Sequence, residues 1–366
     1  MGHPVVISAN YGLGGAPLNI ENSGETTRVL PAGFTAHGND IIGSHARFVK
    51  ADIVITLYDS WVFDPQVTAG FRWVPWAPVD HAPLPEAVKR ALMPAWQPIA
   101  YSRFGFDKMK EAGLDPRYVP HGIDTDTYQP MDMDEARKSI KLPRDDYDFL
   151  AVMVAANKGV PSRKSFGEVL DAWASFVQYK PKALLYMHTH PGEQMQGMDI
   201  PMLIRLYGLT EENVCFCDPY WNLLGYPDTY LRDLYSAADV LVSPSKGEGF
   251  GIPLVEAQAC GCPVIVTDAT AMSELCFSGW KVGYQREATP LGAFQFVPRV
   301  GEILDSLLDA YAKRGYEKMR RDARRGAEPY SADIVAETYW RPVLDELAQS
   351  ISGDADPLGL VDLGAA

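Results

Sequence analysis

The chain has 366 residues, of which 47% are apolar, as expected for a globular protein with about two domains. Its formal net charge of −14 disfavours nucleic acid and anionic lipid as general partners. No apolar run reaches the roughly 18 residues of a membrane-spanning helix, and the first residues lack the basic and apolar regions of a signal peptide.

Short apolar runs alternate with helical patterns along most of the chain. In chain order, strands are predicted at residues 5–9, 52–57, 149–154, 183–188, 213–216, 240–243 and 264–266. Helices are predicted at residues 85–93, 104–112, 166–179, 229–237, 253–260, 300–312 and 332–349. The strands are rich in Val, Ile and Leu, which is typical of parallel strands buried on both faces. The alternation predicts an α/β fold with doubly wound sheets.

A glycine-rich loop, from Gly12 to Gly15, follows the first predicted strand. A nicotinamide-binding domain needs the pattern G-x-G-x-x-G at the start of a helix. Here the spacing differs, and residues 22–27 carry no helical period. We therefore disfavour a nicotinamide oxidoreductase.

Two cations precede the predicted helix at residues 166–179. Arg163 and Lys164 come directly before Ser165, and Ser165 with Glu168 has the spacing of a capping box. Two positive charges beside a helix N-terminus suit a diphosphate. The alternative is a pair of solvated surface charges.

The most informative stretch follows the predicted strand at residues 240–243. It holds a glycine-rich loop at residues 247–251, and Pro253 fits the first turn of the next helix. Glycines let the backbone approach a ligand closely, and the free amides and the helix dipole favour a phosphate group. The stretch therefore predicts an anion site.

Two carboxylates flank this anion site. Glu248 lies in the loop, and Glu256 lies eight residues further on, inside the helix. A carboxylate accepts two hydrogen bonds and suits the vicinal hydroxyls of a sugar or a ribose. The pair does not fit a glycosidase, whose carboxylates face each other across the bond that is cleaved.

This stretch, with the letters EGFGIPLVEA, resembles the signature of the retaining glycosyltransferases of family 4, the glycosyl transferases group 1 of the GT-B superfamily. The turn at residues 118–124 and the segment at 100–102 are similar as well. The resemblance implies two Rossmann-like domains that face each other across a cleft. We expect an acceptor domain at residues 1–145, a donor domain at 146–330, a helix at 332–349 that packs back on the first domain, and a flexible tail at 351–366.

The resemblance also implies roles for single residues. It implies that Glu248 contacts hydroxyls of the donor sugar and that Glu256 holds the ribose of the nucleotide. It implies that Arg163 and Lys164 grip the diphosphate and stabilise the leaving group. The further donor-binding candidates are Asn157, Gly249, Phe250 and Gly251.

The reaction that the resemblance implies moves a sugar from a nucleotide-diphosphate sugar to an unidentified acceptor, with retention and with no cofactor. The candidates for catalysis are Arg163, Lys164 and Glu248, since no nucleophile is visible and the front-face mechanism usually described for the family needs none. We expect no metal site, because His188 and His190 lack further ligands at suitable spacing.

The acceptor side departs from the family pattern. Asp59 and His81 are candidates to line the acceptor cleft, but Tyr58 stands where the family often has a histidine. The chain also reads as if it begins at the family's second strand, without the first βα unit. The alternative function is therefore a catalytically weak or inactive module that binds nucleotide sugars.

Other partners and the compartment follow from charge and cysteines. Cys215 and Cys217 form a C-x-C pair, as do Cys260 and Cys262, which indicates reduced thiols in a cytoplasmic protein. We expect no nucleic acid partner. A basic run at residues 313–325 predicts a solvated helix face and at most peripheral contact with a membrane. Its cations are Lys313, Arg314, Lys318, Arg320, Arg321, Arg324 and Arg325.

Overall fold

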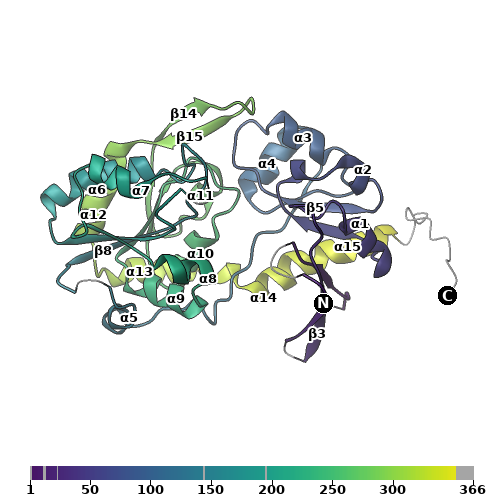
Figure 1. The fold of residues 1–366 in the computed structure, drawn as a ribbon, viewed down its shortest axis with the longest axis horizontal. Helices are drawn as coiled ribbons and strands as arrows, with labels where there is room; N and C mark the ends of the chain where they lie inside the picture. Colours follow the sequence, from purple (N-terminus) through teal and green to yellow (C-terminus); the bar gives the residue numbers. More distant parts are fainter. Residues whose placement is uncertain (1, 11–13, 23, 143–144, 194–195, 352–366) are drawn as a thin grey trace.

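The computed structural model describes residues 2–10, 14–22, 24–142, 145–193 and 196–351. These residues form two α/β domains that lie side by side (Figure 1). Each domain has a central parallel sheet. The predicted α/β fold with two Rossmann-like domains is therefore confirmed.

The sheet of the first domain has four parallel strands in sequential order. These are β4 (Val54–Leu57), β5 (Trp73–Ala77), β6 (Ile99–Ala100) and β7 (Arg117–Tyr118). The helices of this domain are α1 (Ile42–Phe48), α2 (Pro65–Thr68), α3 (Glu86–Leu92) and α4 (Arg103–Glu111), with a 3₁₀ turn at Ser60–Val62.

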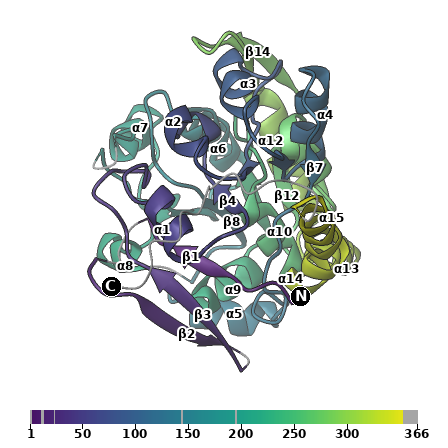
Figure 2. The same ribbon diagram turned by 90° about the vertical axis from the view of Figure 1, so that its right-hand side faces the viewer.

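A separate three-stranded sheet stands at the beginning of the chain. It consists of β1 (Val6–Ser8), β2 (Leu18–Asn22) and β3 (Glu25–Leu30), and β2 and β3 project from the first domain (Figures 1 and 2). The strand at residues 5–9 was predicted to be buried, but Val5 is 62% exposed and Ile7 45%. The prediction was wrong because β1 pairs with a hairpin instead of joining the central sheet. Of the glycine-rich loop, Gly12 and Leu13 lie outside the described residues.

The six-stranded sheet of the second domain has the order β10-β9-β8-β11-β12-β13 and is parallel throughout. Its strands are β8 (Phe149–Val154), β9 (Ala183–His188), β10 (Val214–Phe216), β11 (Val240–Ser243), β12 (Val264–Thr267) and β13 (Gly279–Val282). A hairpin follows, formed by β14 (Tyr284–Ala288) and β15 (Phe294–Pro298).

Alternate residues of these strands enter two different cores. Along β8, Leu150 and Val152 pack on one face of the sheet, whereas Phe149 and Ala151 pack on the other. Helices cover both faces, so the strands read as continuous apolar runs. Truncation of a fully buried residue such as Leu150 to alanine costs about 2–5 kcal/mol.

The helices of the second domain divide between the two faces. On the face of Phe149 lie α6 (Phe166–Tyr179), α7 (Ile200–Leu206) and α12 (Val300–Ala312). On the face of Leu150 lie α5 (Met133–Ser139), α9 (Asp228–Ala237), α10 (Ile252–Ala259), α11 (Thr270–Glu274) and α13 (Glu317–Ala327). The helix α5 thus packs in the second domain, although the sequence predicts the domain boundary between residues 145 and 146. The short helix α8 (Pro219–Leu224) lies outside both cores.

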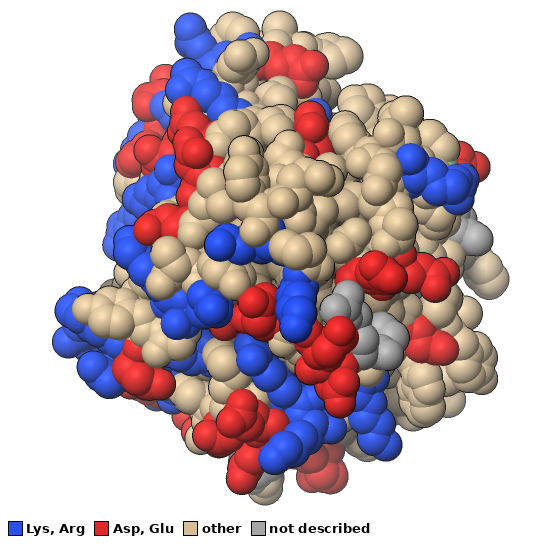
Figure 3. Space-filling model, turned by 90° about the vertical axis from the view of Figure 1, so that its left-hand side faces the viewer, with Lys and Arg blue, Asp and Glu red and all other residues tan. Residues whose placement is uncertain are grey.

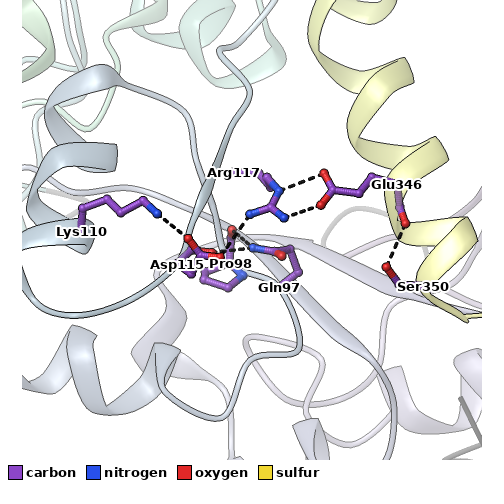
Figure 4. A network of polar contacts seen from close by, with 7 residues as sticks. All are labelled: Gln97, Pro98, Lys110, Asp115, Arg117, Glu346 and Ser350. Carbon is purple, nitrogen blue, oxygen red and sulfur yellow. Dashed lines mark hydrogen bonds and ion pairs between the residues drawn. The ribbon is translucent and has the colours of Figure 1, made fainter. Parts of the chain in front are cut away.

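The end of the described chain crosses back to the first domain. After a 3₁₀ turn (Glu328–Tyr330), it forms α14 (Ala332–Val335), a π-helical turn (Ala336–Trp340) and α15 (Arg341–Ile351), where one helix was predicted. Val343 packs with Val74 in a core of the first domain. Arg117 of β7 forms an ion pair with Glu346 of α15, and Ser350 donates to the carbonyl of Glu346 (Figure 4).

The two chain segments that connect the domains are hydrogen-bonded to each other. Ile123 donates to the carbonyl of Tyr330 and accepts from the amide of Ala332, both at 2.8 Å. A side chain at Gly122 would lie 2.7 Å from the Cα of Ala332, so only glycine fits there. These contacts fix the connection between the two domains.

Candidate active site

The order of the six strands changes direction between β8 and β11. In an open α/β sheet, the loops that leave such neighbouring strands diverge and form a ligand site at their carboxyl ends. The loop after β8 carries Arg163 and Lys164, which we call the cation pair. The loop after β11 is the predicted glycine-rich loop, residues 247–251, which we call the donor loop. The fold therefore brings the two predicted anion sites together.

The cation pair binds Glu248 of the donor loop. Lys164 Nζ lies 2.5 Å from Glu248 Oε1, and Arg163 Nη1 lies 2.9 Å from Oε2. Burial on its own raises the pKa of Glu248, but the charges and hydrogen bonds of Lys164 and Arg163 outweigh it and lower the pKa to about 2. Arg163 also donates to the carbonyl of Gly247.

The donor loop presents free backbone donors. The amide of Glu248 is bonded to Thr270 Oγ1 at 3.1 Å. In contrast, the amides of Gly249, Phe250 and Gly251 donate to no acceptor among the described residues. Gly251 has φ +106°, which favours glycine, and it directly precedes α10. These amides are thus available to an anion at the helix N-terminus.

The first domain lies directly against the donor loop. A side chain at Gly249 would come within 2.7 Å of Pro78 Cβ and 3.0 Å of Tyr101 Cε2, and one at Gly247 would collide with the carbonyl of Asp80. Arg163 Nε lies 3.8 Å from the Asp80 carboxylate. The site is therefore built from both domains, and its glycines allow the close approach.

Glu256 lies in different surroundings, within α10 and against α9. Its Oε2 accepts a hydrogen bond from Tyr235 Oη at 3.1 Å. Burial raises the pKa of Glu256 to about 7, and the charge of Asp228 adds to the effect, while the hydrogen bond from Tyr235 opposes it. This carboxyl group is thus half protonated near neutral pH.

The predicted acceptor residues lie on the side of the first domain. Burial and then the charge of Asp80 raise the pKa of Asp59, whereas Arg163 lowers it, so Asp59 interacts electrostatically with Arg163. His81 is buried, and its Nδ1 lies 2.6 Å from Asp80 Oδ1. Sequence reasoning missed Asp80, although the residue lies in the loop that contains His81.

The loop after β8 also carries Ser165 and Asn157. Ser165 adopts a left-handed conformation (φ 58°), makes no capping hydrogen bond, and leaves its Oγ buried without a partner among the described residues. The predicted capping box is therefore wrong, since Glu168 turns instead to Lys246 at 3.0 Å. The Asn157 side chain bonds to the loop at residues 190–198 through both of its polar atoms. Its donor-binding role stays a prediction.

Most of the basic run at residues 313–325 is paired within the protein. Arg320 donates to the carbonyls of Ser236 and Ala238 at the end of α9, and Arg324 donates to the carbonyl of Ala259 at the end of α10. These cations thus stabilise helix C-termini. On the end face of the second domain, positive and negative side chains are interspersed (Figure 3). In the described part of the chain, no helix is both long and apolar enough to cross a membrane.

Part of the chain is similar to known proteins. Residues 160–289 match the model of the family described as "Glycosyl transferases group 1". A D-inositol 3-phosphate glycosyltransferase from Catenulispora acidiphila is 33% identical over 162 residues, which are 42% of this chain and 35% of that protein. The chain thus spans about a third of the length of the curated relatives it matches.

The structural comparisons cover nearly the whole chain. Sucrose-phosphate synthase from Thermosynechococcus elongatus aligns with a TM-score of 0.71 at 19% identity, over 95% of this chain and 90% of that one. The Anabaena protein Alr3699/HepE aligns with a TM-score of 0.60 at 18% identity, over 90% of this chain and 87% of that one. This chain has the GT-B glycosyltransferase fold. The GT-B fold that the resemblance of the EGFGIPLVEA stretch implies is thereby confirmed, and the donor loop lies where the two domains meet.

Proposed function

We propose that this GT-B protein transfers a sugar from a nucleotide-diphosphate sugar to an acceptor, with retention of the anomeric configuration and without a metal ion. The observation that carries the proposal is the meeting of the cation pair and the free amides of the donor loop at the switch point between β8 and β11. Fixed positive charge and oriented amides at this place suit a diphosphate.

The donor is proposed to lie across α10. Its diphosphate takes the amides of Gly249, Phe250 and Gly251, and Glu256 accepts hydrogen bonds from the ribose hydroxyls. The structure of the Anabaena protein Alr3699/HepE is described as a complex with UDP and glucose, which supports this class of ligand. The base and the sugar of the donor are left open by these contacts.

Glu248 and the proposed diphosphate share the same binding partners. Its carboxylate already occupies Arg163 and Lys164, and the diphosphate competes with it for the same two cations. When the diphosphate binds, Glu248 is released and becomes able to accept hydrogen bonds from hydroxyls of the donor sugar. The ion pair is thus compatible with the sugar-binding role that the sequence predicts.

Catalysis is proposed to come from stabilisation of the leaving group. As the bond between the sugar and the diphosphate breaks, negative charge develops on the diphosphate, and Arg163 and Lys164 stabilise this charge. The acceptor approaches from the first domain, where Asp59 and His81 line its path. We propose that the reaction takes place in the cytoplasm, and the five free cysteines support this compartment.

The test is a transfer assay with a panel of nucleotide sugars and candidate acceptors, with and without EDTA. We expect release of nucleoside diphosphate, a product with the anomeric configuration of the donor by NMR, and no effect of EDTA. Binding of a nucleotide sugar with neither transfer nor hydrolysis would favour the alternative of a binding module. No binding of any nucleotide sugar would contradict both functions.

A further inference from the structure

Besides Asp80, which faces Arg163, a second carboxylate connects the two domains, away from the cation pair. Glu274, the last residue of α11, accepts hydrogen bonds from the amides of Arg103 at 2.9 Å and Phe104 at 3.3 Å. These are the first two residues of α4 in the first domain. A carboxylate at a helix N-terminus satisfies free amides and interacts favourably with the helix dipole.

The first domain already has a cap of its own for this helix. Ser102 Oγ accepts from the amide of Gly105 at 3.0 Å, which satisfies one of the free amides of α4. Glu274 satisfies two others from the opposite domain. Burial raises its pKa, and the two amide hydrogen bonds and Arg103 oppose this shift. The contact joins the two domains.

The same short helix holds the donor loop. Thr270, the first residue of α11, accepts from the amide of Glu248 through its hydroxyl at 3.1 Å, and the amide of Ala271 donates to the carbonyl of Glu248 at 3.4 Å. Within α11, Met272 is fully buried, as is Leu275 directly after it. Five residues of a firmly packed helix thus connect α4 of the first domain to Glu248.

We infer that Glu274 is a positioning residue that holds the first domain closed over the donor loop. Its hydrogen bonds to α4 are made in the closed arrangement and are replaced by water in an open one, so they shift the equilibrium toward closure. Through α11, the closed arrangement also fixes the backbone of Glu248. The consequence for catalysis rests on the proposed glycosyl transfer, whereas the consequence for closure does not.

The test compares two variants of Glu274 with a matched capping variant inside one domain. Glu274→Ala removes both hydrogen bonds, and Glu274→Gln keeps a carbonyl that accepts one. The control is Asp132→Ala, because Asp132 caps α5 by accepting from Asp134 and Glu135 at 3.0 Å each, wholly within the second domain. For each variant we measure the radius of gyration by X-ray scattering, the melting temperature, and kcat and KM for the donor.

We expect Glu274→Ala to enlarge the ligand-free protein and to lower kcat by roughly five- to thirtyfold, the effect of one to two capping bonds. The KM for the donor should change less than kcat, because the cation pair, the free amides of the donor loop and Glu256 all belong to the second domain. Glu274→Gln should recover part of both effects. Asp132→Ala should lower the melting temperature without changing the radius of gyration or kcat.

An unchanged radius of gyration in Glu274→Ala would overturn the inference, and so would equal effects of Glu274→Ala and Asp132→Ala on kcat. If the wild-type protein transfers no sugar, the proposed function fails, but the scattering comparison still decides whether Glu274 holds the domains closed.

Discussion

Glu248 and Glu256 are the same residue type, eight positions apart on one loop and helix, and their surroundings differ completely. Glu248 lies between two cations at the boundary with the first domain, which lowers its pKa to about 2. Glu256 lies among tyrosines inside the second domain, and burial raises its pKa to about 7. Glu248 therefore keeps its full charge at every physiological pH, whereas the charge of Glu256 changes near neutrality.

This difference shows what each carboxylate is suited for. Glu248 balances the cation pair, for which we propose that a diphosphate competes. Burial favours the neutral form of Glu256, whereas hydrogen bonds from hydroxyl groups favour the ionised form.

The largest effect is expected from the cation pair. Arg163→Ala and Lys164→Ala should each lower kcat by roughly 10²–10³-fold, because each removes a positive charge that stabilises the leaving group. Steady-state kinetics measure this. The matched control is Lys313→Ala, which removes a surface cation paired with Asp309 at 2.6 Å, and its kcat should stay unchanged. A loss below twofold for both Arg163→Ala and Lys164→Ala would contradict the proposed mechanism.

The second prediction concerns Glu248 and acid stability. Its pKa in the folded state is lowered from its ordinary value of 4.5 to about 2, so its stabilising contribution is present above pH 4.5 and is lost as the pH falls toward 2. That contribution is about 3 kcal/mol. Urea unfolding should therefore show a steeper loss of the free energy of unfolding between pH 4.5 and 2.5 for the wild type than for Glu248→Gln. Parallel curves would show that the ion pair does not exist in solution.

The third prediction concerns Glu256 and nucleotide affinity. In the proposed role, the ionised form of Glu256 accepts hydrogen bonds from the ribose hydroxyls. The affinity for a nucleotide-diphosphate sugar should therefore be roughly tenfold lower at pH 6 than at pH 8. A nucleotide sugar is the right probe, since both of its phosphates are esterified and do not titrate near neutrality. Calorimetry of Glu256→Gln should give a flat pH profile. Without ligand, the raised pKa means that the wild type loses stability relative to this variant as the pH rises from 4.5 to 7.

The smallest effect is expected at Ser165, beside the cation pair. Ser165→Ala should not lower the free energy of unfolding, because the hydroxyl makes no capping bond and lies buried without a partner among the described residues. A true cap would lose about 1 kcal/mol. Chemical denaturation separates these two outcomes, and a loss of 1 kcal/mol or more would restore the capping box that the sequence predicts.

The second domain could be predicted closely because its signals are local. The apolar runs at residues 149–154 and 183–188 match β8 and β9 at both ends, since strands buried on both faces leave a continuous pattern. The strand β5 was missed because Pro75 and two tryptophans interrupt that pattern. Strand β1 was placed but judged buried, since the sequence does not reveal what covers a strand.

The site could be predicted only in part, because some of its residues act through contacts between distant parts of the chain. Glu248, Glu256 and the cation pair lie in stretches with recognisable spacing. Asp80 and Glu274 act across the domain boundary, and no spacing within the chain predicts which loops meet there. The left-handed backbone of Ser165 also has no signal, since serine at that place is equally compatible with a cap.

The central claim is that the cation pair and the donor loop hold a diphosphate while Glu256 holds the ribose. A crystal structure with a bound nucleoside diphosphate tests it most directly. We predict diphosphate oxygens within hydrogen-bond distance of the amides of Gly249 and Phe250, Glu248 displaced from Arg163 and Lys164, and the Glu256 carboxylate on the ribose hydroxyls. A nucleotide bound elsewhere, with Glu248 still paired to both cations, would contradict the account.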